Sequence, residues 1–101
     1  MAYNPDLADR VRAIIGEPVE ERRMMGSLAF CVNGRIAVGV SGDEAFFPVG
    51  GGAALDVALT RGAHRLTMPG GRSAPFAALT DPPDDVLADW IAEAIERARR
   101  R

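Results

Sequence analysis

Hydrophobic positions recur with helical spacing near both ends of the chain. Near the start, Asn4 is a good N-cap, Pro5 suits a first helical turn and Gly16 suits a stop. The apolar stripe between them consists of Leu7, Val11, Ile14 and Ile15. Near the end, a wider stripe follows Asp84 and Asp85 and precedes a run of arginines. Its members are Leu87, Trp90, Ile91, Ala94, Ile95 and Ala98. The pattern therefore predicts an opening and a closing amphipathic helix.

Between the helices, residues 22–40 alternate as two strands around Asn33-Gly34. A two-residue loop there would put the two apolar sets on opposite faces. A three-residue loop, with Gly34 left-handed as a bulge, pairs Phe30 with Ile36 and Leu28 with Val38. Burial should enforce this second register, because a slip of one residue inverts every side chain. The other face would then carry small side chains and one arginine, and it is a candidate contact surface: Ala29, Cys31, Arg35, Ala37 and Gly39.

The remaining segments predict shorter elements. A third strand over 45–49 contains Pro48, so it should be an edge strand or end at that residue. A short helix over 53–60 follows Gly50–Gly52, and weak strands follow over 64–68 and 75–79. Residues 17–21 are expected to be a polar connector. The order α-β-β-β-α-β-β-α predicts one α+β domain over residues 1–101.

Composition narrows the class of protein. The chain has 101 residues, 48% hydrophobic and 26% charged, with a formal net charge of −2, which is not typical of a nucleic-acid binder. One cysteine excludes an intramolecular disulfide. No apolar run approaches the roughly 18 residues of a membrane helix, and the N-terminus does not resemble a signal peptide. We therefore expect a cytoplasmic protein without membrane contact.

Several segments resemble one family in order and spacing. They are the stretch from Arg23 to Phe30 (Arg-Met-Met-Gly-Ser-Leu-Ala-Phe), then Val32-Asn33-Gly34, Gly39-Val40-Ser41-Gly42, Gly71-Arg72, and Leu87 to Ala94 with Trp90. These segments resemble the N-terminal domain of the TfoX/Sxy regulators of bacterial natural competence. The resemblance implies a two-layer fold similar to type III secretion chaperones, with a five-stranded antiparallel sheet in the order 1-2-5-4-3. The third strand would then be an edge, and the chain would correspond to the family's N-terminal domain without its C-terminal one.

Catalytic and metal-binding residues are sparse. A Cys31 nucleophile would need a base, and His64 is the only histidine. These two side chains do not supply the three or four protein ligands of a zinc site. Gly50–Gly52 lacks the Gly-Lys-Ser/Thr ending of a phosphate loop. We expect no catalytic residue, no cofactor and no metal, with a Cys31–His64 enzyme as the least favoured hypothesis.

Contacts with another macromolecule are the leading hypothesis. We expect a non-enzymatic regulatory or protein-interaction domain whose partner is a protein, and a homodimer through a strand edge is a further expectation. The alternative is nucleic-acid association through the arginine-rich C-terminus, although these arginines also suit the negative end of a helix. Arg72 could bind a partner carboxylate or pair with Asp43 or Asp81. The candidate interaction residues are Arg22, Arg23, Met25, Arg35, Arg72, Arg97, Arg99 and Arg100.

Overall fold

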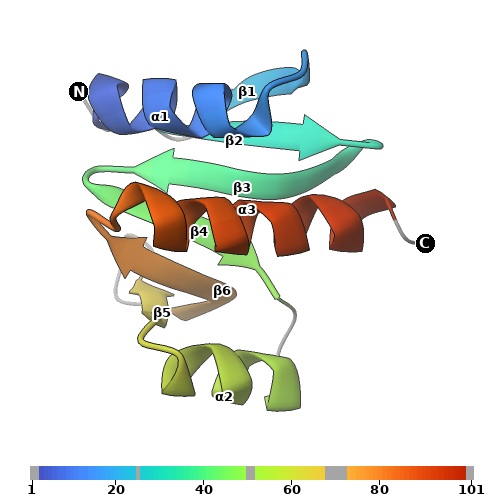
Figure 1. Ribbon diagram of the computed structural model, residues 1–101. Coiled ribbons are helices and arrows are strands. Elements are labelled where there is room, and N and C mark those ends of the chain that lie inside the picture. Colours follow the sequence, from blue (N-terminus) through green and yellow to red (C-terminus); the bar gives the residue numbers. More distant parts are fainter. Residues whose placement is uncertain (1–2, 25, 50–51, 68–72, 100–101) are drawn as a thin grey trace.

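The structure, a computed structural model, describes residues 3–24, 26–49, 52–67 and 73–99. Within these ranges the elements are α1 (Pro5–Ile15), β1 (Glu20–Met24), β2 (Ser27–Val32), β3 (Arg35–Ser41), β4 (Glu44–Pro48), α2 (Gly52–Thr60), β5 (His64–Thr67), β6 (Ser73–Thr80) and α3 (Asp84–Arg99). The strands form one antiparallel sheet in the order β1-β2-β3-β4-β6-β5. Helices α1 and α3 lie against one face of it (Figure 1). The predicted α+β fold is confirmed.

The opening helix begins and ends where its sequence predicted. The side-chain oxygen of Asn4 accepts hydrogen bonds from the backbone N–H groups of Asp6 and Leu7, at 2.9 and 3.4 Å. Gly16 takes the left-handed conformation that closes the helix, with a φ of 71°. In the described part of the chain, no helix is long and apolar enough to cross a membrane.

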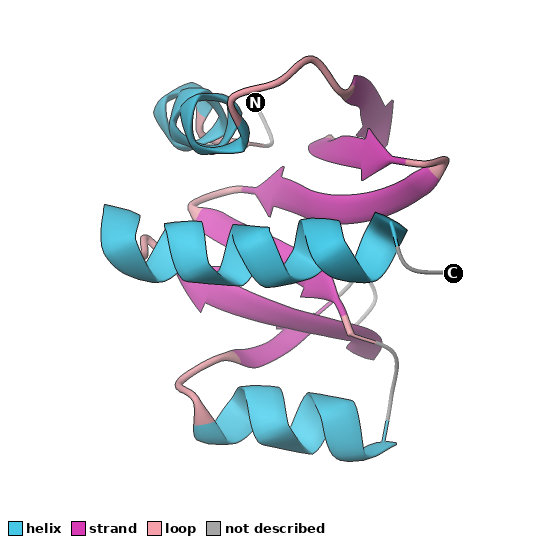
Figure 2. Ribbon diagram, turned by 45° about the vertical axis from the view of Figure 1, so that its right-hand side comes forward, coloured by secondary structure: helices cyan, strands magenta, loops and turns pink. Residues whose placement is uncertain are grey.

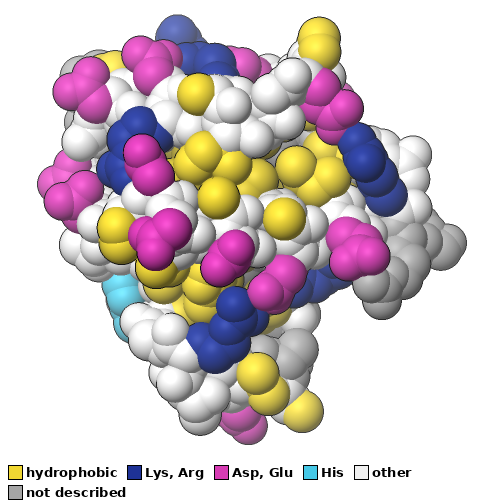
Figure 3. All heavy atoms as spheres, viewed as in Figure 1, with side chains coloured by type: hydrophobic (Ala, Val, Ile, Leu, Met, Phe, Trp, Pro, Cys, Tyr) yellow, Lys and Arg dark blue, Asp and Glu magenta, His cyan; other side chains and the backbone are white. Residues whose placement is uncertain are grey.

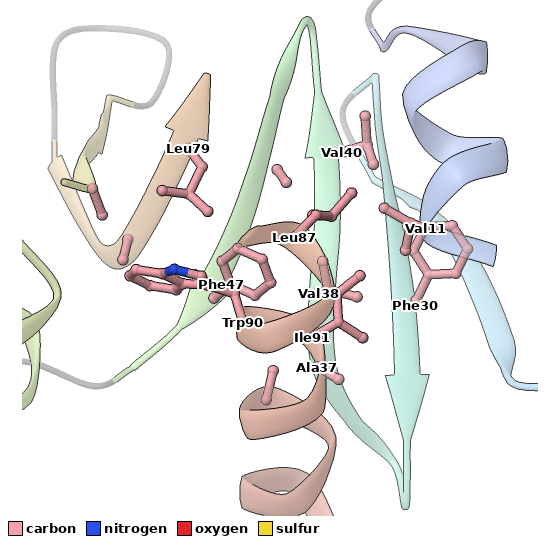
Figure 4. Close-up of a cluster of buried hydrophobic side chains, with 14 of the residues drawn as sticks. Val11, Phe30, Ala37, Val38, Val40, Phe47, Leu79, Leu87, Trp90 and Ile91 are labelled. Carbon is pink, nitrogen blue, oxygen red and sulfur yellow. The ribbon is translucent and has the colours of Figure 1, made fainter. Parts of the chain in front are cut away.

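The main core lies between the sheet and the helices. Figure 2 shows α3 crossing the face of the sheet, and α2 lies beyond it beside β5 and β6. Leu87, Trp90 and Ile91 of α3 point toward Val38 and Phe47 of the sheet (Figure 4). The largest side chains with under 2% exposure are Phe30, Phe47, Leu87, Ile91, Val11, Val38 and Val40.

The β2–β3 hairpin has most of its large side chains on one face, but the predicted pairs are wrong. Phe30 lies opposite Val38 and Leu28 opposite Val40, and all four side chains belong to the main core. Ile36, expected on that face, instead packs on the other one beside Phe46.

The turn of this hairpin also differs from the prediction. Asn33 and Gly34 both have positive φ, at 56° and 76°, as a two-residue type I′ turn requires. Val32 lies directly opposite Arg35, and the extra residue is Ala37, within β3. The predicted three-residue loop is wrong because asparagine tolerates the left-handed conformation. The bulge that puts most large side chains of the hairpin on one face therefore lies at Ala37, within the paired part of β2 and β3, and not in the turn.

Two predictions about the sheet edges are also wrong. Residues expected as a connector form β1, whose Glu20-Glu21-Arg22-Arg23 sequence has no apolar alternation to signal a strand. The sheet therefore contains the five expected strands and a sixth. The resemblance implied that β4 is an edge strand, but it lies between β3 and β6, so the implied order 1-2-5-4-3 is replaced by 1-2-3-5-4 for the same five strands. β4 does end at Pro48, as its sequence allowed.

The far face of the sheet is not an open surface of small residues. Ala29 and Cys31 are 0% and 3% exposed, and Ala37 belongs to the main core on the other face. Phe46 lies over Gly39 on the far face. The sequence-based expectation of a contact surface there is therefore wrong, with the exception of Arg35, which is exposed.

Candidate functional site

Strands β3 and β4 separate soon after their hairpin. They pair only at Ser41–Glu44, Val40–Ala45 and Gly39–Phe46, whereas β4 and β6 stay paired as far as Pro48 and Phe76. Figure 4 shows the two strands opening as a V. Two local features favour this divergence, because Pro48 has no N–H to donate and Ala37 interrupts the regular pleat of β3.

Helix α3 runs along the V from its closed end to its mouth (Figures 1 and 4), and a groove lies under its later turns. Its first turns place Leu87, Trp90 and Ile91 over the sheet (Figure 4). The later turns present Ala94 and Ala98. The smaller side chains leave this groove, of about 410 Å³, between α3 and the separated strands. We call it the Arg35–Arg97 groove, and its lining is Arg35, Ile36, Ala37, Pro48, Val49, Phe76, Ala94, Arg97 and Ala98.

Among the described residues, no carboxylate lies within 4.0 Å of either arginine of this groove, and the charge of Arg97 contributes to the lowered pKa of Glu93. Arg97 donates only one long hydrogen bond, at 3.4 Å, to the carbonyl oxygen of Pro48. Glu93, one turn earlier on α3, is held by Arg61 through hydrogen bonds of 2.9 and 3.0 Å. Arg35 is exposed at the start of β3, and the residue opposite it is Val32, which cannot pair with its charge.

Most other described arginines are already paired. Carboxylates lie within 4.0 Å of five of them: Arg10 with Asp81 and Asp84, Arg12 with Asp9 and Glu21, Arg22 with Glu20, Arg61 with Glu93, and Arg99 with Glu17. Arg23 on β1 is also exposed and has no carboxylate within 4.0 Å among the described residues, so what distinguishes the groove is that two such arginines line one apolar opening.

The predicted interaction residues are not gathered at one place. Arg35 and Arg97 meet at the groove, whereas Arg22 and Arg23 lie on β1 at an edge of the sheet. Arg99 pairs with Glu17 beyond α1. The predictions for Met25, Arg72 and Arg100 fall outside the described residues, as do Gly50 and Gly51.

The Cys31–His64 hypothesis is excluded by the sheet. Cys31 lies on β2 and His64 on β5, so β3, β4 and β6 run between them. Four strand spacings amount to about 19 Å, far beyond hydrogen-bond reach. The His64 ring instead contacts the carboxylate of Glu44. Burial raises the pKa of the Cys31 thiol, which opposes formation of a thiolate.

A second depression lies between α1 and α3. It measures about 590 Å³ and contains Ile14, Ile15 and Ile95, with the Glu17–Arg99 ion pair at its rim. Figure 3 shows apolar atoms in yellow between these helices, with acidic side chains along the outer surface of α3. The charges of Arg99 and Glu17 neutralise each other, so this depression is less selective for a charged ligand than the Arg35–Arg97 groove.

No family model, no curated protein and no solved structure matches the chain. Within the described ranges, no three His, Cys, Asp or Glu side chains come together as a set that could hold a metal ion. Sequence reasoning singled out Arg35 and Arg97 for separate reasons, and it missed their shared groove. The only sign of the groove in the local sequence was a pair of small residues, Ala94 and Ala98, four residues apart on the apolar stripe of α3.

Proposed function

We propose that this chain is a non-enzymatic protein-binding domain whose partner occupies the Arg35–Arg97 groove. The observation that carries the proposal is a pair of arginines beside an apolar opening, neither with a carboxylate within 4.0 Å in the described ranges. A guanidinium forms strong bidentate pairs with carboxylates, and burial of apolar surface contributes roughly 25 cal/mol per Å². A protein segment that combines apolar and acidic side chains would satisfy both requirements.

The resemblance to TfoX/Sxy N-terminal domains gives this binding a context. It suggests a regulatory role, related to competence or transcription, in the cytoplasm. In that role the domain would act by occupying or recruiting a partner rather than by transforming a substrate.

Nucleic-acid binding is the competing proposal, and the charge distribution favours it less. Arg99 is paired with Glu17, which removes one cation from the arginine-rich terminus. The exposed side of α3 also carries Asp85 and Asp89, whose charges would repel phosphates.

A comparative pull-down tests the proposal. The wild type, Arg35→Glu/Arg97→Glu and the matched control Arg23→Glu are used as baits in lysate of the source organism, after melting curves confirm that all three fold. We expect at least one protein captured by the wild type and the control and lost from the double variant. Equal capture by all three baits would overturn the groove as the binding surface.

A second experiment examines the competing class of partner. Duplex DNA is titrated into the wild type and the double variant at two salt concentrations. We expect no salt-dependent binding. Salt-dependent binding that Arg35→Glu/Arg97→Glu weakens would replace the protein partner with nucleic acid.

A further inference from the structure

We infer that the Arg35–Arg97 groove takes an extended peptide segment, with apolar side chains and a carboxylate, that adds as a strand beside β3. The inference rests on the proposed function and specifies the chemistry of the partner. It follows from the free backbone edge, the apolar surfaces on both faces of the sheet, and the unpaired arginines.

Within the described parts of the chain, the backbone of β3 has an unpaired edge at the mouth of the V. Arg35, Ile36 and Val38 pair with β2, Ala37 is the extra residue of that ladder, and none of these four residues pairs with β4. Groups on the side of a strand that lacks a neighbour are available to another extended chain. The opposite edge is less suitable, because β4 ends in Pro48, which cannot donate.

The apolar lining lies on both faces of the sheet. Ala37, Ala94 and Ala98 belong to the main core on the helix side, whereas Ile36 and Phe76 pack in the cluster on the far side. Successive side chains of a strand point to opposite faces. An extended segment entering between β3 and β4 would therefore have apolar contacts for both sets of its side chains.

The arginines determine the charge of the segment. Arg35 begins β3 and Arg97 lies in the last turns of α3, and both residues line the same groove. A carboxylate, either a C-terminus or an acidic side chain, would form charge-assisted hydrogen bonds with them. A fatty acid shares this chemistry without the peptide backbone, and the experiment must separate the two.

The test is an NMR titration with defined probes. The first probe is acetyl-Thr-Val-Leu-Val-Ala with a free C-terminal carboxylate, and the others are its C-terminal amide, a version with proline in place of both valines, a version with aspartate before a C-terminal amide, and decanoate. We expect the first probe and the aspartate version to shift the NMR signals of the backbone amides of residues 35–38. Both should bind at least tenfold more tightly than the C-terminal amide of the first probe and the proline version. Decanoate should bind more weakly than the first probe or the aspartate version.

Variants locate the binding. Ala94→Leu should fill the groove and weaken the carboxylate peptides at least tenfold, and Arg35→Glu/Arg97→Glu should do the same without adding bulk. Ala92→Leu, on the exposed side of the same helix, and Arg23→Glu are the matched controls and should bind like the wild type. If Ala94→Leu does not fold, the double arginine variant still decides.

Failure of this inference can be told apart from failure of the proposed function. Decanoate binding as tightly as the peptides, or a proline version as strong as the first probe, would overturn the strand model. The strand model would also be overturned if no peptide bound while a protein partner was still captured by the wild type and lost from Arg35→Glu/Arg97→Glu. That outcome would leave the proposed function standing. Loss of both would overturn both.

Discussion

The ring of Phe46 lies over Gly39, its direct partner in the β3–β4 ladder, and leaves no room for a side chain there. A Cβ at Gly39 would lie 2.1 Å from Cζ of Phe46. The same ring stacks on Phe76, with 5.3 Å between ring centroids. The absence of a side chain at position 39 therefore allows aromatic rings to cover the far face of the sheet.

Gly39→Ala should lower the free energy of unfolding by about 1–3 kcal/mol, because the new methyl group forces the Phe46 ring to move. Urea unfolding measures the change. In a Phe46→Leu background the same substitution should cost less, since the obstructing ring is gone. Equal costs in both backgrounds would show that the ring is not the cause.

Glu93→Gln should destabilise the protein modestly and in a pH-dependent way. Hydrogen bonds from Arg61 lower the pKa of Glu93 from its ordinary value of 4.5, so the folded state binds its proton less tightly than the unfolded chain. The stabilisation is therefore complete above the unfolded pKa and is lost as pH falls through the lower, folded pKa. Both side chains are partly exposed, so about 0.5–1 kcal/mol is expected near pH 7.

The measurement is urea unfolding followed by fluorescence of Trp90, the only tryptophan, whose ring Arg61 covers at 4.4 Å. The difference between wild type and variant should shrink as the pH falls below 4.5, the ordinary pKa of a glutamate. Asp56→Asn, an exposed carboxyl of α2, is the control. A difference that stays constant with pH would contradict the role of the Arg61–Glu93 pair.

The Cys31 thiol should react slowly in the folded protein. Its side chain is 3% exposed, and burial raises its pKa, so both access and thiolate formation are suppressed. Labelling with a thiol reagent at mildly alkaline pH should be at least a hundredfold faster in urea than in native buffer. Comparable rates in the two conditions would mean that the β2 strand opens readily.

Asn4→Ala should cost about 1 kcal/mol of unfolding free energy, because the N-cap acceptor of α1 is lost. Asn4 also donates a hydrogen bond of 2.9 Å to the carboxylate of Asp43. Asn4→Ser keeps a capping oxygen but loses this contact, so thermal melting should place it between the wild type and Asn4→Ala. Equal melting temperatures for the two variants would show that the cap contributes nothing.

The local sequence explains more of the fold than of the site. Asn4 and Gly16 mark both ends of α1, and Asn33-Gly34 marks the turn of the β2–β3 hairpin. The β1 strand escaped prediction because its charged residues show no apolar alternation. The position of the bulge at Ala37 was not predicted either. An extra residue in the turn or within β3 brings Leu28 and Phe30 onto the same face as Val38 and Val40, so the alternation of apolar residues does not distinguish the two positions.

The sequence by itself determined the helices, the predicted strands and the α+β class, because caps, turns and apolar periodicity act over a few neighbouring residues. Only the tertiary structure decided the strand order, the position of β4 inside the sheet and the placement of Arg35 and Arg97 along one groove. These depend on contacts between residues far apart in the chain. The divergence of two strands and the small alanines of a crossing helix together make a groove that no single segment encodes.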